Sequence, residues 1–473
     1  MRILMLGWEF PPFIAGGLGV ACYGLTKALD RHGHKILFIL PKPVDRAGNA
    51  SHVKMLGSDS PTPPAGSTRT SVMDVEGMPL HGFQNAIFRG VQATFSHSYP
   101  GFDPARIAGV GSAAGIGGVD LSAIQASDET AALLAQSFGG GLGGGSTSAG
   151  LAAGGPGVGY GSDLVGDSER YARLVVALAR GESFDVVHAH DWLTFPAGVA
   201  LSSLSRKPLI VHVHSTEFDR AGTNVNQRVY EIERAGMHHA SRVIAVSQFT
   251  KAICVRRYGV SPSKVDVVYN GIERDHVQPN DGDRIESEDR IVLFVGRITM
   301  QKGPEYFIAA AKRVLEKMSN VKFVLAGSGD MAVRMIELAA SMGIGHKVLF
   351  TGFLRGRDVD RVYQMADCYV MPSVSEPFGI AALEAIKHDV PVILSKTSGA
   401  SEVLTHVLKV DFWDIDEMAN KILAVLRHPP LSQTLRQHGS FELHRLTWDG
   451  AAERCVASYS KAIGATGPSV AAS

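Results

Sequence analysis

Short apolar runs that alternate with helical segments are the feature that most constrains the fold of this chain. Each run has the length and composition of a buried parallel strand, as in RILMLG, KILFIL and LIVHVH, and later in IVLFVG, KFVLAG and PVILSK. Segments with helical periodicity, such as VACYGLTKALDRHG, lie between many of them. This alternation is typical of doubly wound sheets. The sequence therefore predicts an α/β protein with two Rossmann-like domains, each with a doubly wound parallel sheet.

The chain length supports two domains rather than one, because 473 residues exceed what one ordinary hydrophobic core holds. The polar segment 277–290 predicts the join. We expect an N-terminal domain over 1–280, a C-terminal domain over 281–445, and a helix with a flexible tail over 446–473 that packs back across the join. Ligands of open parallel sheets bind beyond the carboxyl ends of the strands, so two facing sheets predict one interdomain cleft.

One segment departs from the alternating pattern. Between residues 109 and 161, glycine occupies 17 of 53 positions without a period of three, and Pro156 is the only proline. This composition excludes collagen and is typical of a disordered insertion. Two interpretations stay open, a disordered loop and a lid over the cleft.

Composition narrows the classes of partner and the compartment. Lys plus Arg and Asp plus Glu number 46 each, which removes any whole-chain electrostatic attraction to nucleic acid or to an anionic membrane. The four cysteines are widely spaced without a C-x-x-C pair, which favours free thiols in a reducing cytoplasm and no structural metal. No run approaches the roughly 20 apolar residues that span a bilayer. We therefore expect a cytoplasmic protein without a transmembrane segment.

Two acidic residues, Glu376 and Glu384, lie eight positions apart in MPSVSEPFGIAALEAIKHD. The strand CYVMPS precedes them, and a helix is expected to begin near Phe378 or Gly379. The N-terminus of a helix attracts an anion such as phosphate, and the two carboxylates flank it. Because carboxylates accept hydrogen bonds from hydroxyls, a diphosphate between two polyols fits this stretch. The alternative is that Glu376 complements the helix dipole and Glu384 lies on a solvated face.

Two basic residues and a glycine turn form further candidates for phosphate binding. Arg297 follows the strand IVLFVG, and Lys302 lies in the loop just before the next helix, an arrangement that suits a diphosphate. Ordinary solvation of both side chains is the alternative. Gly16 and Gly17 in WEFPPFIAGGLGVACYG permit a tight turn and the close approach of a ligand, or only a plain turn between strand and helix.

Two histidines lie near the end of a later apolar strand, in the segment DVVHAHDWLTF. His188 and His190 lie two positions apart and therefore point to the same side of the strand. No cysteine or acidic cluster accompanies them to complete a metal site, so contact with a substrate hydroxyl is favoured over zinc. A strand histidine that bonds only the backbone is the third interpretation. His212 and His214 in VHVHS carry the same alternatives.

These motifs together resemble the GT-B nucleotide-sugar glycosyltransferases of families four and five, the group that contains sucrose-phosphate synthases and glycogen or starch synthases. The resemblance covers nearly the whole chain except the glycine-rich insertion. It rests on the E-x7-E signature, the Arg-x4-Lys pair, the glycine turn, the HAHDW segment and the YNGI loop, which place the matching residues at Glu376 and Glu384, Arg297 and Lys302, Gly16 and Gly17, His190, and Asn270.

The resemblance implies a retaining, metal-independent hexosyltransferase without a cofactor, with ADP-glucose or UDP-glucose as donor and a glycan or small molecule as acceptor. Cleavage of a nucleotide sugar puts negative charge on the diphosphate and positive character on the anomeric carbon. The family roles would place Arg297 and Lys302 at the diphosphate, Glu376 at the sugar hydroxyls and Glu384 at the ribose. The remaining expected contacts are His190 to the sugar, Gly16, Gly17 and Gly379 to the donor, and Asn270 to acceptor or sugar.

Departures from the pattern leave the product open. Glycogen and starch synthases of family five carry the motif K-x-G-G-L at the first turn, whereas this chain has IAGGL there. Their later T-G-G motif corresponds to TSGA in this chain. Glu384 is more typical of family four, whereas WEFPP and HAHDW resemble synthases of the glycogen type. A glycogen or α-glucan synthase-like transferase is the first expectation, and a family-four enzyme that builds surface glycans or glycosylated small molecules is the second.

Other classes of protein fit parts of the sequence. KFVLAGSGDMA reads G-x-G-x-x-A, as in dinucleotide oxidoreductases, but the next strand lacks the acidic residue that would hold an adenosine ribose. Asp358 with Asp360, and Asp414 with Asp416, could suggest metal-dependent transfer, although both pairs precede helices, where capping is expected. A sugar-nucleotide epimerase and a non-catalytic nucleotide-sugar sensor would use similar strand-end loops.

Overall fold

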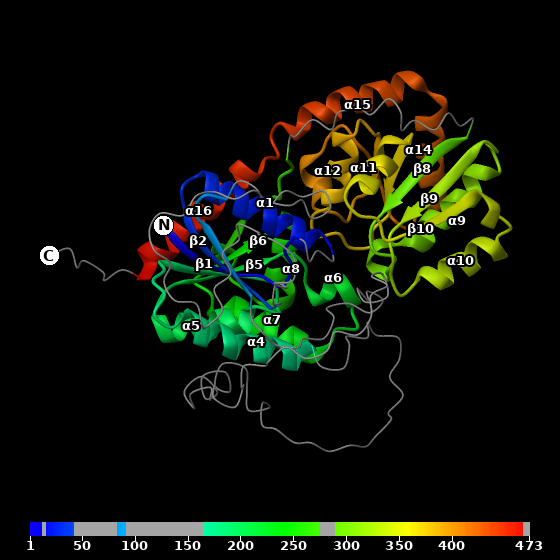
Figure 1. Ribbon diagram of the computed structural model, residues 1–473. Helices are drawn as coiled ribbons and strands as arrows, with labels where there is room; N and C mark the ends of the chain where they lie inside the picture. Colours follow the sequence, from blue (N-terminus) through cyan, green and yellow to red (C-terminus); the bar gives the residue numbers. More distant parts are fainter. Residues whose placement is uncertain (12–15, 42–82, 91–163, 274–288, 467–473) are drawn as a thin grey trace, which may run out of the picture.

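The computed structural model describes residues 1–11, 16–41, 83–90, 164–273 and 289–466. Two parallel sheets form two α/β domains, which confirms the predicted fold class (Figure 1). The glycine-rich insertion and most of the predicted join lie outside the described residues.

Seven parallel strands form the N-terminal sheet, in the spatial order β3-β2-β1-β4-β5-β6-β7. Its strands are β1 (Arg2–Leu6), β2 (Lys35–Leu40), β3 (Ala86–Gly90), β4 (Val186–His190), β5 (Leu209–Val213), β6 (Arg242–Ala245) and β7 (Val265–Val267). The helical elements between them are α1 (Gly17–Arg31), α4 (Leu164–Ala179), α5 (Phe195–Ser205), α6 (Glu217–Ala221), α7 (Gln227–His239), α8 (Gln248–Tyr258) and η2 (Pro262–Lys264). Helices α4, α5 and α7 cover one face, and α1 covers the other.

Six parallel strands form the C-terminal sheet, in the order β10-β9-β8-β11-β12-β13. Its strands are β8 (Arg290–Val295), β9 (Val321–Ala326), β10 (Val348–Gly352), β11 (Cys368–Met371), β12 (Val392–Ser395) and β13 (Leu408–Val410). The helical elements are η3 (Met300–Lys302), α9 (Pro304–Leu315), α10 (Ala332–Ser341), η4 (Gly345–Lys347), α11 (Arg357–Gln364), α12 (Ile380–Lys387), α13 (Ala400–Val403), α14 (Ile415–Arg427) and α15 (Pro429–Leu443). Helices α9, α10 and α14 pack on one face, and α11 and α12 on the other.

Strand β1 shows why the apolar runs are continuous rather than alternating. Its residues contribute in turn to the hydrophobic cores on the two faces of the sheet, Ile3 and Met5 to one and Leu4 and Leu6 to the other. All four side chains are at most 1% exposed. Helices on both faces remove any solvated side, so each position of the strand must be apolar. The four cysteines are likewise buried and free.

The C-terminal helix α16 (Trp448–Thr466) returns to the N-terminal domain and lies beside α1 (Figure 1). The backbone N–H of Ile272 donates to the carbonyl of Leu446 at 3.0 Å, which holds the two interdomain segments side by side. The indole of Trp448 packs where a Cβ at Gly24 would stand, so a glycine is required in α1. Among the described helices, none combines the length and the apolar character that crossing a bilayer requires.

Polar contacts join the domains beside the cleft. Ser375 Oγ, in the loop after β11, donates to Asp219 Oδ1 in α6 at 2.5 Å. The carboxylate of Glu402 accepts from the backbone N–H groups of Gln248 and Phe249, at 2.9 and 2.6 Å. Those N–H groups belong to the first turn of α8, where a helix has unpaired donors and partial positive charge.

Candidate functional site

A cavity of about 320 Å³ lies between the two domains, beyond the carboxyl ends of strands from both sheets. The predicted interdomain cleft is therefore present among the described residues. Eight of the nine predicted site residues line it, namely Gly16, Gly17, Asn270, Arg297, Lys302, Glu376, Gly379 and Glu384. His190 is the ninth, and it is completely buried.

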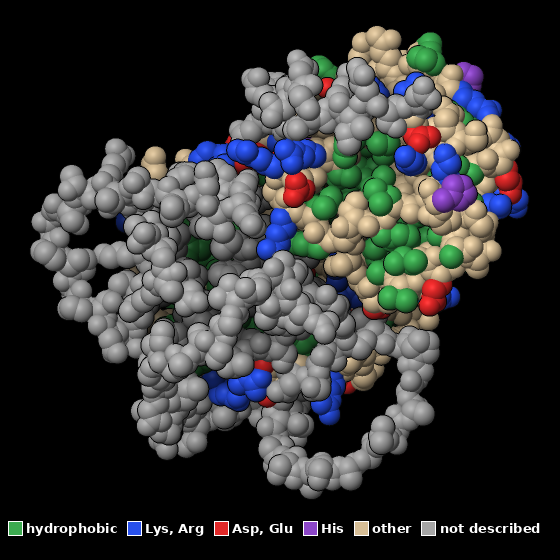
Figure 2. All heavy atoms as spheres, turned by 45° about the vertical axis from the view of Figure 1, so that its right-hand side comes forward, with side chains coloured by type: hydrophobic (Ala, Val, Ile, Leu, Met, Phe, Trp, Pro, Cys, Tyr) green, Lys and Arg blue, Asp and Glu red, His purple; other side chains and the backbone are tan. Residues whose placement is uncertain are grey.

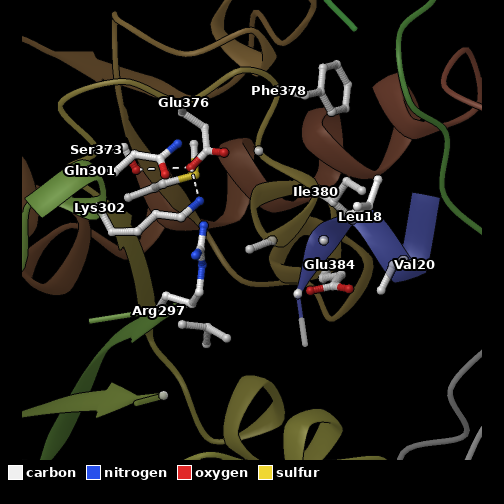
Figure 3. Close-up of a pocket in the computed structure, with 18 of the residues that line it drawn as sticks. Leu18, Val20, Arg297, Gln301, Lys302, Ser373, Glu376, Phe378, Ile380 and Glu384 are labelled. Atoms are coloured by element: carbon white, nitrogen blue, oxygen red, sulfur yellow. Dashed lines mark hydrogen bonds and ion pairs between the residues drawn. The ribbon is translucent and has the colours of Figure 1, made fainter. Parts of the chain in front are cut away.

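An ion pair lies in the cavity wall that the C-terminal domain forms. Lys302 Nζ lies 2.5 Å from Glu376 Oε2, and Ser373 Oγ donates to the same oxygen at 3.1 Å (Figure 3). The backbone N–H of Glu376 donates to the carbonyl of Thr397 at 3.0 Å. Glu376 is only 6% exposed, so its carboxylate position is set by these contacts rather than by solvent. Arg297 points toward the same space in Figure 3, which brings a second cation to the pair.

Two helices begin at this side of the cavity through glycines in the left-handed region. Gly303, with φ 63°, precedes α9, and Gly379, with φ 107°, precedes α12. A Cβ at Gly379 would meet Met371 and Glu376. Both the backbone conformation and the space therefore require glycine there. The first turn of α12 lines the cavity, and its unpaired N–H groups suit an anion.

Glu384 lies apart from the Lys302–Glu376 pair, on the side of the cavity where Leu18 and Val20 lie (Figure 3). Tyr363 Oη is 3.2 Å from Glu384 Oε2, in a contact that fixes the carboxyl. Burial raises the pKa of Glu384 above its ordinary value. The two glutamates thus flank the start of α12 without sharing one position, as the spacing predicted.

The glycine turn faces the cavity from the N-terminal domain. Gly16 has extended backbone, with φ −178°, and Gly17 is the first residue of α1. No described atom lies within 4 Å of a Cβ built at either position. The fold among these residues therefore does not demand glycine, and the absence of side chains leaves space for a ligand.

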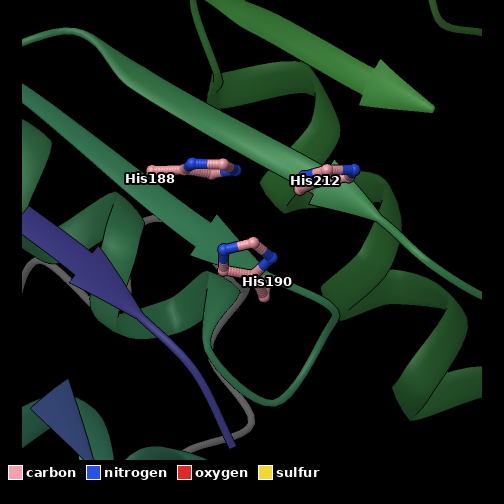
Figure 4. Close-up of side chains that lie close together, drawn as sticks. All are labelled: His188, His190 and His212. Carbon is pink, nitrogen blue, oxygen red and sulfur yellow. The ribbon is translucent and has the colours of Figure 1, made fainter. Parts of the chain in front are cut away.

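Histidines from β4 and β5 form a buried cluster. The sequence spacing predicted that His188 and His190 lie on one side of a strand, but not that His212 lies beside them. His188 and His190 on β4 lie beside His212 on β5, with ligand atoms within 4.8 Å of one another (Figure 4). The ring planes of His188 and His212 are 9° apart, and both make 28° with His190. Lone pairs in nearly parallel rings do not converge on one ion, so the geometry favours stacking. Burial lowers the pKa of all three imidazoles.

In the cavity wall, Glu9, Asp191 and Ser215 were not predicted as ligand contacts, whereas His214 was an open candidate for contact with a substrate hydroxyl. Asp191 has φ 57°, and its Oδ1 accepts from the backbone N–H groups of His214 and Ser215 at 2.7 and 3.3 Å. Burial raises the pKa of Asp191 to about 7. The signal that could have found these residues is their place directly after β1, β4 and β5, where the carboxyl ends of strands meet.

The competing motifs have structural explanations. A Cβ at Gly327 would collide with the carbonyl of Gly296, and one at Gly329 with the carbonyl of Ile298. These glycines of the dinucleotide-like motif therefore permit close packing of two loops. Asp414 accepts from the backbone N–H of Glu417 and caps α14, as predicted for that pair.

Family models match three consecutive parts of the chain. They are described as starch synthase catalytic domain over residues 2–107, glycosyltransferase family 4 over 154–276, and glycosyl transferases group 1 over 280–440. The chain belongs to the group 1 glycosyltransferases. The resemblance inferred from the five motifs is thereby confirmed.

Curated relatives of this glycosyltransferase differ in their named activities. An uncharacterized glycosyltransferase of Methanocaldococcus jannaschii is 36% identical over 240 residues, 48% of this chain and 61% of the relative. A D-inositol 3-phosphate glycosyltransferase of Segniliparus rotundus is 26% identical, over 59% of this chain and 66% of the relative. The match thus spans less than two thirds of both relatives. A glycogen synthase of Mycobacterium tuberculosis is 24% identical over 85% of this chain and 80% of its own length.

Solved structures show the fold of this glycosyltransferase to be GT-B. Sucrose-phosphate synthase from Thermosynechococcus elongatus superposes with a TM-score of 0.67 at 18% identity, over 98% of this chain and 100% of the other. HepE from Anabaena, in complex with UDP-glucose, gives a TM-score of 0.60 at 17% identity, over 97% and 99% of the two chains. Likeness at this identity concerns the fold alone.

Proposed function

We propose that this protein is a retaining glycosyltransferase that moves a hexosyl unit, expected to be glucosyl, from a nucleotide sugar to a glycan acceptor. The observation that carries the proposal is the Lys302–Glu376 ion pair in the interdomain cavity, with Arg297 beside it. A nucleotide sugar offers a diphosphate next to a ring of hydroxyls. These are the two groups that an ammonium and a carboxylate bind best.

In this proposal, binding of the nucleotide sugar replaces the ion pair between Lys302 and Glu376 by contacts from each residue to the donor. Without a ligand, Lys302 and Glu376 neutralise each other. When the donor enters, its diphosphate takes over Lys302 and Arg297, and its sugar hydroxyls donate to Glu376. The charge that grows on the diphosphate as the bond to the anomeric carbon breaks is then stabilised where it appears. The start of α12 adds backbone N–H groups to the same task.

The transfer itself exchanges one bond for another. The bond between the anomeric carbon and the diphosphate oxygen breaks, and a bond to an acceptor hydroxyl oxygen forms on the same face of the sugar. The acceptor proton leaves with the diphosphate, so charge and atoms balance. No glutamate acts as a nucleophile in this scheme, since the carboxylate of Glu376 accepts hydrogen bonds from Ser373 and from the sugar hydroxyls, which it orients.

The wall on the N-terminal side favours an uncharged acceptor. Glu9 and Asp191 bring two carboxyl groups to it, with exposed fractions of 4% and 9%. Among the described residues, the Lys and Arg side chains that line the cavity are Arg297 and Lys302, both from the C-terminal domain. Carboxyl oxygens accept hydrogen bonds from hydroxyls, and the ionised form of either group repels a phosphorylated acceptor. An oligoglucan end therefore fits this wall better than an inositol phosphate.

The test is incubation of the full chain with radiolabelled ADP-glucose or UDP-glucose and either an oligoglucan or an inositol phosphate. We expect label in the oligoglucan, with an α-linkage by proton NMR. Glu376→Ala should abolish transfer, whereas the exposed control Glu337→Ala should not. Transfer to inositol phosphate alone would establish the small-molecule alternative, and an isomerised free donor without transfer would refute the transferase.

A further inference from the structure

A buried tyrosine behind the cavity wall holds one of the two predicted glutamates. Helices α11 and α12 pack on the same face of the C-terminal sheet. Glu384 of α12 lines the cavity, whereas Tyr363 of α11 is completely buried and lies outside the wall. Tyr363 Oη is 3.2 Å from Glu384 Oε2. The phenol therefore reaches the carboxyl group from inside the domain rather than from the ligand space.

The hydroxyl of Tyr363 has a second acceptor, because the carbonyl of Ala381 in α12 also lies 3.2 Å from Oη. Burial raises the pKa of Tyr363 above its ordinary value, so the hydroxyl keeps its hydrogen. When Glu384 is ionised, that hydrogen goes to the carboxylate, which is the stronger acceptor. When Glu384 is protonated, its O–H donates to Tyr363 Oη, and the phenol hydrogen goes to Ala381. The contact between the two side chains therefore persists in both protonation states.

The ring of Tyr363 is itself held in place. His388, four positions after Glu384, stacks on it with 5.4 Å between ring centroids and 10° between ring planes. His388 Nε2 lies 3.1 Å from Asp360 Oδ1 of α11, and the His388 side chain is only 4% exposed. Two residues of α11, three positions apart, thus face two residues of α12, four positions apart, as neighbours on helix surfaces do. Stacking and burial together restrict the rotation of Tyr363.

A carboxyl group that is fixed before binding recognises a pair of hydroxyls better than a mobile one. Fixing a glutamate side chain costs rotamer entropy, and here the cost falls on folding rather than on binding. Oε1 of Glu384 has no hydrogen-bond partner in the described part of the chain, so it is left for a ligand. A mobile carboxyl group can turn to the one hydroxyl that a 2′-deoxyribose keeps. A fixed one loses a hydrogen bond that it cannot replace.

We infer that Tyr363 is a positioning residue that orients Glu384 toward the ribose and thereby makes the protein select a ribonucleotide donor over its 2′-deoxy counterpart. This inference rests on the proposed function, because the nucleotide sugar supplies the ribose. The contacts among Tyr363, Glu384 and His388 are present without a ligand and do not depend on it.

Binding of nucleoside diphosphates tests the inference without an assay of transfer. Isothermal calorimetry on the full chain compares ADP, UDP and GDP with their 2′-deoxy forms, and the base that binds most tightly is then used for the variants. The wild type should bind the ribonucleotide about 10- to 100-fold more tightly, as expected for one hydrogen bond to a charged group. Tyr363→Phe should reduce this preference to less than about threefold, mainly through weaker binding of the ribonucleotide.

The matched control is Tyr171→Phe, which removes the same atom from another completely buried tyrosine. The Tyr171 hydroxyl donates to the carbonyl of Ile39 at 2.8 Å in the N-terminal domain, and the residue lies outside the cavity wall. This variant should keep the wild-type preference. Glu384→Ala should remove the preference. The double variant Tyr363→Phe/Glu384→Ala should bind both nucleotides as Glu384→Ala does, because Tyr363 acts through Glu384.

A second pair of variants reaches the same hydroxyl through the ring that stacks on it. His388→Ala frees the phenol and should reduce the preference about threefold, whereas His388→Phe keeps a stacked ring and should retain it. This pair decides the question if Tyr363→Phe does not fold. An unchanged preference in Tyr363→Phe, an equal loss in Tyr171→Phe, or a further loss in the double variant overturns the inference.

The inference and the proposed function fail in different experiments. If the preference depends on Tyr363 as expected but the wild type transfers no sugar, the proposed function fails and the inference stands. If transfer is active but the wild type binds the ribonucleotide and its 2′-deoxy form equally, the inference fails and the proposed function stands. Binding of none of the three nucleotides overturns both.

Discussion

Lys302 Nζ lies 2.5 Å from Glu376 Oε2 across 74 positions of sequence, and this pair joins the loop after β8 to the loop after β11. The two strands are neighbours in the sheet, which is why residues so distant in sequence meet. Each side chain neutralises the other. In the proposed reaction a donor would replace this contact, so donor affinity should depend on the charge of both groups.

Replacing Lys302 by Ala should weaken donor binding more than it weakens folding. Loss of a charge-assisted contact to the diphosphate should raise the dissociation constant for UDP-glucose or ADP-glucose about 10- to 100-fold, by roughly 1.5 to 3 kcal/mol. Isothermal calorimetry measures this constant. The control Lys322→Ala removes a lysine of β9 that pairs with Asp289, and it should bind the donor as the wild type does. Equal affinities in all three proteins would contradict the assignment.

Alanine at Gly17 should leave stability unchanged and impair donor binding. No described atom would meet the added Cβ, and alanine favours a helix over glycine by about 1 kcal/mol, so the melting temperature should stay the same or rise. The methyl group would instead fill ligand space. Gly24→Ala is the contrasting variant, because its Cβ would collide with the Trp448 ring and loosen α16 from α1. Thermal unfolding and calorimetry together check both outcomes.

Replacing His212 by Phe should leave the protein as stable or more stable at neutral pH. Neither ring nitrogen of His212 has a hydrogen-bond partner among the described residues, and an apolar ring of similar shape removes two desolvated polar atoms. Chemical denaturation at pH 7.5 gives the free energy of unfolding. A loss of several kcal/mol would show that the nitrogens have partners that the described contacts lack.

The same variant should also change the pH dependence of stability. Burial lowers the pKa of His212 below 6.5, so the unfolded chain binds a proton there below about pH 6.5 while the folded chain does not. Stability is therefore complete above that pH and falls as the pH falls. In His212→Phe the slope between about pH 6.5 and 5 should be shallower, by up to 1.4 kcal/mol per pH unit.

Glu402 should control the closure of the domains. Its carboxylate accepts from two N–H groups at the start of α8, and Tyr269 Oη lies 3.1 Å from it. Glu402→Ala leaves these donors to water and should lower the closed population, since an exposed charge at a helix start contributes about 0.3 to 1 kcal/mol. Small-angle scattering should show a larger radius of gyration than for the exposed control Glu453→Ala. An identical radius would place the control of closure elsewhere.

Much of the fold and the C-terminal half of the site could be predicted from the sequence. The two-domain α/β architecture followed from apolar runs with helices between them, because strands buried on both faces leave no polar positions. Glu376, Gly379 and Glu384 were found as a unit because they surround one helix start, so their relation is local. Arg297 and Lys302 were found for the same reason, as both lie in one loop.

Relations across strands needed the tertiary structure. The spacing of His188 and His190 predicted that both point to the same side of β4. It could not place His212 and His214 beside them, because β5 begins 19 positions after β4 ends and the two strands meet only in the sheet. Burial of His190 behind His214 depends on that pairing. The sequence by itself determined which chemical groups stand at the strand ends, through short-range periodicity and turn chemistry. Only the packing of two sheets decided which of those groups reach the cavity, because exposure is a property of all neighbouring elements together.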